Sequence, residues 1–349
     1  MIPFLKVKGL VVRVKSLISI LILSLVLQGC VGIYAVVEFE VLEPATVQFP
    51  DRVNQLIFLN RAPLTTDTWS EQNQVGMDAR QLVLLDTLIC NNLNRGALEV
   101  LRNSPIERFH RPIWLSDRRT DTTALEAKIL TKREVGDICD AVGGDAIISL
   151  ESYTTSLGQH FDYYPNSLNE IRNHYFEVSN SVTWIIYLYG SPRPFDTYTT
   201  IDTLFFPVIE DGEFLPNKPG VEMIRDLSYE SGFKYGSYLV PIWNQASRIL
   251  YRGQEDSLKR AVKYIDQGDW ESAFSIWNDL STSADSTLAA KAYHNMAVYY
   301  ELEDKLDTAS VMLDLSLGLD TLDPDRVYRE ELDVRLLNRK DIVKQVIRN

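Results

Sequence analysis

The chain has 349 residues, of which 45% are hydrophobic and 24% are charged, so it can bury a sizeable core and is not disordered throughout. Its formal net charge is −13, and because the first 29 residues carry four basic residues and no acidic one, the remainder carries −17. A surface this acidic repels phosphate backbones, which excludes nucleic acid from the expected partners.

The N-terminal segment has the charge and hydropathy pattern of a signal peptide. A basic stretch that ends at Lys15 precedes an apolar run over residues 17–27, which is broken only by two serines. Such a run spans about 16 Å as a helix, about half of the hydrocarbon core of a bilayer, and is too short for a stable transmembrane span. We therefore expect a signal peptide over residues 1–29 and no membrane-spanning helix in the rest of the chain.

The residues that follow the apolar run, Leu27-Gln28-Gly29-Cys30, resemble the lipobox of bacterial lipoproteins. The resemblance implies cleavage before Cys30, a diacylglycerol on its thiol and a fatty acid such as palmitate on the new amino group. Two or three acyl chains give a durable membrane anchor, where one would be marginal. Gln28 departs from the small or aliphatic residue usual at its position, and the alternative is an ordinary signal peptide followed by a chance cysteine.

Residues 30–252 predict a mixed α+β domain with a long β-hairpin. In the hairpin, apolar residues such as Val178, Val182 and Trp184 alternate with polar ones, and Gly190 and Pro194 mark the turn. We expect the following elements in order: strands 36–42 and 53–59, helices 75–101 and 125–141, strands 145–153, 176–188 and 197–208, and a helix from 221 that Pro241 kinks or divides before an apolar stripe reaching Leu250.

Residues 253–349 predict an all-α region with an internal repeat. Ala261, Tyr264 and Ala273 recur 36 residues later as Ala297, Tyr300 and Ala309, and the alanines of each unit are 12 residues apart. This spacing resembles the two small positions of a tetratricopeptide repeat, where paired helices approach closely. The repeat is longer than the usual period of about 34 residues and only two units are visible, so we expect a further helix from Pro324 to cap them.

Few residues point to chemistry. The four histidines show no metal-ligand spacing, and the chain has no nucleophile-elbow or phosphate-loop motif, so we expect no metal and no cofactor. The nearest catalytic candidate is His160 with Asp162 and Tyr163, in a segment that we expect to be a loop. The sequence leaves open whether Cys90 and Cys139 form a disulfide.

Aromatic residues are the surface feature with a functional character. Phe161, Tyr163 and Tyr164 form a cluster that can stack sugars or anchor a protein partner, and Phe205 and Phe206 follow in the returning strand. Packing in the core of the hairpin is the alternative for the strand residues.

The order of parts resembles a family of Bacteroidota-type lipoproteins that have a lipobox, a mixed α/β domain and tetratricopeptide-like repeats. The residues that carry this resemblance are Tyr235-Gly236, Pro241-Ile242-Trp243, Arg248 and Tyr251. More remotely, the step Gly143-Gly144-Asp145 into a strand resembles curli-secretion lipoproteins and the TolB N-terminal domain. Neither resemblance implies an enzymatic activity or supplies site residues.

The expected function is therefore that of a non-catalytic scaffold, anchored by lipid at the periplasmic face of the outer membrane. Its partner would be an envelope protein or a glycan, bound in part by the repeat. The candidate groove residues are Lys263, Gln267, His294, Asn295 and Tyr299. The alternative is a hydrolase of envelope polymers that uses His160, Asp162 and Tyr163.

Overall fold

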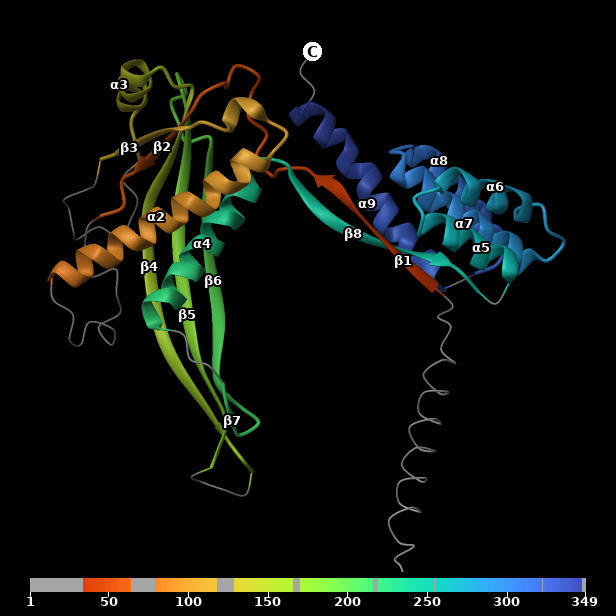
Figure 1. Cartoon of the computed structure of the whole chain (residues 1–349). Helices are drawn as coiled ribbons and strands as arrows, with labels where there is room; N and C mark the ends of the chain where they lie inside the picture. The colour runs from red at the N-terminus through yellow and green to blue at the C-terminus, as the bar shows by residue number, and fades with distance from the viewer. Residues whose placement is uncertain are drawn as a thin grey trace, which may run out of the picture. The chain divides into compact units, whose positions relative to one another are not determined.

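The computed structural model describes residues 34–63, 79–117, 129–165, 170–215, 219–253, 255–321 and 323–346 (Figure 1). The predicted signal peptide and the predicted acylation site Cys30 lie outside these residues. The chain divides into two compact units, which we call the sheet unit (residues 42–244 and 338–349) and the helical unit (residues 245–337 with those up to Val41).

The sheet unit is built on a six-stranded mixed sheet in the order β3-β2-β4-β5-β6-β7. β2 is parallel to both neighbours, and the remaining pairs are antiparallel. The strands are β2 (Leu56–Asn60), β3 (Ile113–Ser116), β4 (Ala146–Tyr163), β5 (Ile171–Leu188), β6 (Asp196–Glu210) and β7 (Glu213–Phe214), and the helices are α2 (Ala79–Asn103), η3 (Glu107–Phe109), α3 (Lys132–Val142) and α4 (Gly220–Leu239).

Side chains alternate across the sheet and build one core on each face. On one face Phe58, Ile148 and Ile186 pack in the same cluster as residues of α2 and α4. On the other face the neighbouring residues, among them Ile57 and Ile147, pack with α3. The predicted mixed α/β part is confirmed. Helix α3 begins and ends at recognisable signals: Thr131 forms a capping box at its start, and Gly143 ends it with a φ of 73°.

Cys90 and Cys139 belong to these two different clusters, on opposite faces of the sheet, so they do not form a disulfide with each other. Burial and the nearby carboxylates of Asp140 and Asp145 raise the pKa of the Cys139 thiol to about 11. This thiol is therefore protonated at neutral pH and behaves as a small apolar core residue.

Helices α2 and α4 lie side by side on their face of the sheet and touch through glycines (Figure 1). A Cβ atom added to Gly96 would lie 2.6 Å from the amide nitrogen of Phe233, and one added to Gly232 would lie 2.7 Å from the carbonyl carbon of Leu93. A Cβ atom added to Gly236 would lie 2.9 Å from the backbone carbonyl oxygen of Ala97. The missing side chains let the two backbones meet directly.

The segment after Pro241 differs from the prediction. In place of a second helical half, residues Ile242–Tyr251 form the strand β8, which pairs with β1 (Tyr34–Glu43) in a separate two-stranded sheet. Pro241 cannot continue α4, which ends at Leu239, and the residue before a proline favours extended backbone. The apolar residues 242, 246 and 250 fit a period of two as well as a helical stripe, so pairing with β1 decided the conformation.

The helical unit contains α5 (Asp256–Ile265), α6 (Trp270–Leu280), α7 (Ser286–Leu302) and α8 (Leu306–Leu319). It also contains α9 (Asp323–Val346) as far as Leu337; the residues of α9 from 338 on belong to the sheet unit. Consecutive helices from α5 to α8 contact one another. The predicted helical C-terminal region is confirmed. Its core contains the four alanines of the sequence repeat, Ala261, Ala273, Ala297 and Ala309, and each of them is fully buried.

We expect Gly232→Ala to destabilise the protein, because its methyl group must force α2 and α4 apart. Overpacking of this kind costs about 1–3 kcal/mol, or a fall of several degrees in the melting temperature of the full chain measured by circular dichroism.

The matched control is Gly136→Ala in α3, where an added Cβ meets nothing within 4 Å. This change should be neutral or stabilise by roughly 0.5–1 kcal/mol, since alanine is the better helix former. A melting temperature for Gly232→Ala at or above that of the unchanged protein would show that the two helices are not in glycine contact.

Candidate functional site

Among the residues that the structure describes, no helix covers one face of the far part of the long sheet. Figure 1 shows β4, β5 and β6 continuing past the N-terminal end of α4. The face opposite α2 and α4 is covered by α3 only near Ile147, Ile185 and Tyr187. Farther along, the cross-strand register places rows of side chains on that face, with His160 opposite Tyr175 and Glu177 opposite Phe205.

A groove of about 450 Å³ lies on this open face. The rings of Tyr175 and Phe205 meet edge to face in it, with centroids 5.6 Å apart, and 60% of Phe205 is exposed. The groove is lined by Asp162, Asn173, Tyr175, Phe205, Pro207, Ile209 and Glu210. We call it the distal groove. It combines aromatic rings with carboxylates and an amide, which is the chemistry of a binding surface.

Beside the distal groove, His160 is held by two neighbours. Its ring stacks on Tyr175 at a centroid distance of 5.0 Å, and its Nε2 lies 2.6 Å from Oε2 of Glu177. The contact with Glu177 orients the imidazole, and the stack supports the ring of Tyr175 from one side. The exposed side chain of His160 thus helps to position the groove.

The three residues of the hydrolase hypothesis lie in a strand, so the expectation of a loop was wrong. β4 extends to Tyr163 because residues 160–163 pair with β5. His160 and Asp162 lie on the same face, but Tyr163 follows a register shift after Asp162 and is 49% exposed. His160 contacts Glu177, a partner that the sequence did not suggest, in place of the two other candidates.

The predicted aromatic cluster is divided between the two faces. Phe161 stacks on His174 at 4.2 Å, on the face opposite His160 and Tyr175. Phe206 packs against the core under α2 and α4, whereas its neighbour Phe205 faces the distal groove. Packing against the core therefore explains why an aromatic residue stands at position 206. Phe205, in contrast, is exposed on the open face.

In the helical unit, two of the five predicted groove residues are buried. His294 is 1% exposed, and its Nε2 lies 3.0 Å from the carbonyl oxygen of Ile249 in β8. Asn295 is fully buried, and its amide both accepts from the backbone N–H and donates to the carbonyl of Tyr251. These side chains hold β8 against α7, so they have no free surface to offer a partner.

The other three candidates reach the surface. Lys263 and Gln267 are exposed, on α5 and just after it. Tyr299 is half-buried and lies 4.7 Å from the ring of Phe274, in a group that also contains Trp270 and Tyr300. We call these four rings the helical aromatic cluster. Burial and the carboxylates of Glu303 and Glu271 raise the pKa of Tyr299, so its hydroxyl remains a donor at neutral pH.

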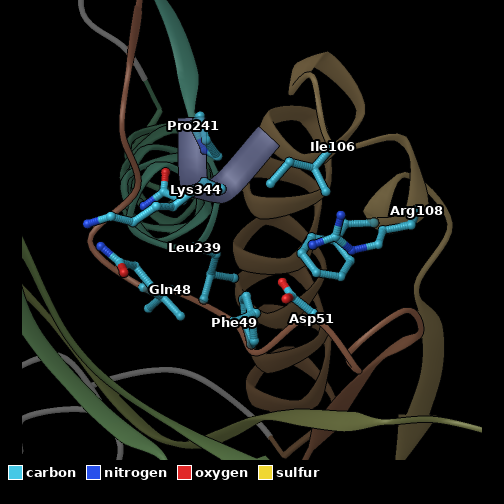
Figure 2. Close-up of a pocket in the computed structure, with 11 residues that line it drawn as sticks. Gln48, Phe49, Asp51, Ile106, Arg108, Leu239, Pro241 and Lys344 are labelled. Carbon is cyan, nitrogen blue, oxygen red and sulfur yellow. The ribbon is translucent and has the colours of Figure 1, made fainter. Parts of the chain in front are cut away.

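A second hollow in the sheet unit, of about 370 Å³, is lined by residues 47–51, by η3, by the C-terminal end of α4 and by the end of α9 (Figure 2). Its basic side chains are engaged within the protein. Arg108 donates through Nε to the carbonyl of Val53 and lies over the ring of Phe109, and Lys344 pairs with Asp341 at 2.9 Å. Because its charges are already used, this hollow is a weaker candidate than the distal groove.

In the described parts of the chain, no helix is both long and apolar enough to cross a membrane. Within the same residues, no three His, Cys, Asp or Glu side chains are placed to hold a metal ion.

Comparisons with known proteins give two family matches. Residues 106–251 match a family described as Domain of unknown function (DUF8603), and residues 259–319 match another described as Domain of unknown function (DUF6340). A comparison with curated protein sequences finds no match. Among solved structures, a neuraminyllactose-binding hemagglutinin homolog from Helicobacter pylori is 9% identical with a TM-score of 0.29, over 55% of this chain and 83% of that chain.

Proposed function

We propose that the protein is a lipid-anchored lipoprotein of the cell envelope that acts as a non-catalytic scaffold and binds a partner through exposed aromatic surfaces. The lipobox-like residues that end at Cys30 support the lipid anchor. The resemblance to Bacteroidota-type lipoproteins supports the periplasmic face of the outer membrane as the location.

One observation carries the binding role. Phe205 is 60% exposed in the distal groove. Its neighbours in β6, Leu204 and Phe206, face the other side of the sheet and pack toward the core. A large aromatic residue on a solvent-facing strand position gains little from folding, because its apolar surface remains in water. Exposed aromatic residues that are gathered in a groove beside polar groups are typical of surfaces that bind a partner.

The helical unit supports a second contact surface of the tetratricopeptide type. Ala273 and Ala309 are each the fourth residue of their helix, α6 and α8, and both are fully buried. Trp277 and Leu313, four residues farther on, are also fully buried. This repetition of small and bulky positions is what a tetratricopeptide-like pairing of α5 with α6 and of α7 with α8 requires. Lys263, Gln267 and the helical aromatic cluster are its accessible residues.

The anchor is tested at Cys30. We expect Cys30→Ser to abolish incorporation of a fatty-acid probe and to release the protein from the membrane fraction, because serine offers no thiol for the diacylglycerol. Cys139→Ser serves as the matched control and should label like the unchanged protein. Labelling of Cys30→Ser at the unchanged level would contradict the anchor.

The binding role is tested in cells with the photocrosslinker p-benzoylphenylalanine in place of Phe205. If the groove binds a partner, irradiation should give one adduct of defined mass on a denaturing gel. Tyr189, an aromatic residue that is 45% exposed at the opposite end of β5, provides the control position. The same adducts at both positions, or none at position 205, would contradict a binding role for the groove.

A further inference from the structure

We propose that the distal groove binds a basic segment of a partner protein, with lysine or arginine side chains seated on the aromatic rings between the carboxylates. This inference rests on the proposed binding function and adds the chemistry of the partner.

Acidic residues outnumber basic residues around the groove. The described residues at this end of the sheet, 158–165, 170–177 and 205–215, contain six acidic residues: Asp162, Glu170, Glu177, Glu210, Asp211 and Glu213. They contain one lysine or arginine, Arg172, which pairs with Asp211 at 3.1 Å. The groove lining has two carboxylates and no basic side chain. The local field therefore attracts cations and repels anionic ligands.

The two carboxylates of the lining are uncompensated. Among the described residues, Asp162 and Glu210 have no side-chain hydrogen bond and no ion pair, and both residues are exposed. By contrast, Glu177, just outside the groove, contacts His160. A neutral sugar would leave both carboxylates without a counter-charge, whereas a lysine or arginine side chain would supply one.

The aromatic floor favours the same occupant. The faces of aromatic rings are electrostatically negative and attract ammonium and guanidinium groups that approach within about 6 Å. The ring of Tyr175 stacks on His160 and meets the ring of Phe205 edge to face. Phe205 is 60% exposed and can take the apolar stem of a long basic side chain. Rings and carboxylates together therefore fit a cationic segment better than an anionic or neutral one.

The inference is tested by fluorescence anisotropy with the full chain in detergent and a labelled peptide of alternating arginine and glycine. We expect binding that weakens with salt. The double change Asp162→Asn with Glu210→Gln keeps the shape and removes both charges, so the peptide should bind about tenfold more weakly, as expected for two exposed ion pairs. Phe205→Ser should also weaken binding but should leave the salt dependence unchanged.

The matched control removes two exposed charges elsewhere, by Asp279→Asn with Glu271→Gln on α6. It should bind the peptide within about twofold of the unchanged protein, since it leaves both groove carboxylates in place. An equal loss in both double variants, or no binding of the arginine peptide, would overturn the inference. Binding of a chitin hexasaccharide that survives the loss of both groove charges, in place of the peptide, would also overturn it.

The crosslinking at position 205 separates the two levels of the proposal. An adduct in cells, combined with no affinity for the arginine peptide, would leave the binding function standing and exclude a basic partner. Peptide binding with no adduct at position 205 would place the basic partner at another site and contradict both.

Discussion

The sheet unit depends on the close contact between α2 and α4. With Gly96, Gly232 and Gly236 at the crossing, the two backbones approach near enough for both helices to share one face of the sheet. Tyr235 then reaches the sheet and stacks on Trp184 at 4.6 Å. Both long helices lie on the same face, and in the described part of the chain only the short helix α3 packs on the other face, near one end of the sheet. The distal groove is thus a consequence of how the helices pack.

The helical unit is organised around a buried charge. Glu301 in α7 is fully buried and accepts two hydrogen bonds from Arg248 in β8, at 2.8 and 2.9 Å, and one from Arg335 in α9 at 2.8 Å. Both arginines also lie over the ring of Phe39 in β1. Removing one partner from such a network leaves an uncompensated buried charge, at a cost of about 3–5 kcal/mol. Together with His294 and Asn295, it fixes β8 and β1 on the helices.

The sequence predicted the mixed α/β part and the helical C-terminal region, but neither strand β8 nor the site. Continuing the hairpin register back from the turn at Gly190 would have paired Tyr175 with Pro207 and Glu177 with Phe205. The loop expected at His160 concealed a different pairing, that of β4 with β5, which places His160 opposite Tyr175. Local composition favoured a turn where tertiary pairing gave a strand. Likewise, the polar residues His294 and Asn295 looked accessible because nothing local reveals that β8 would need their hydrogen bonds.

We propose that the protein binds its partner at the open sheet face. This can be tested by the rate of maleimide modification of a cysteine placed in the groove, Pro207→Cys, with and without a saturating arginine–glycine peptide. Ile201→Cys is the reference: it lies on the same face of β6, roughly 20 Å away, and Ile201 is 73% exposed. We expect the peptide to slow modification severalfold at position 207 and to leave position 201 unaffected. Equal rates at position 207 with and without the peptide, or equal slowing at both positions, would contradict this proposal.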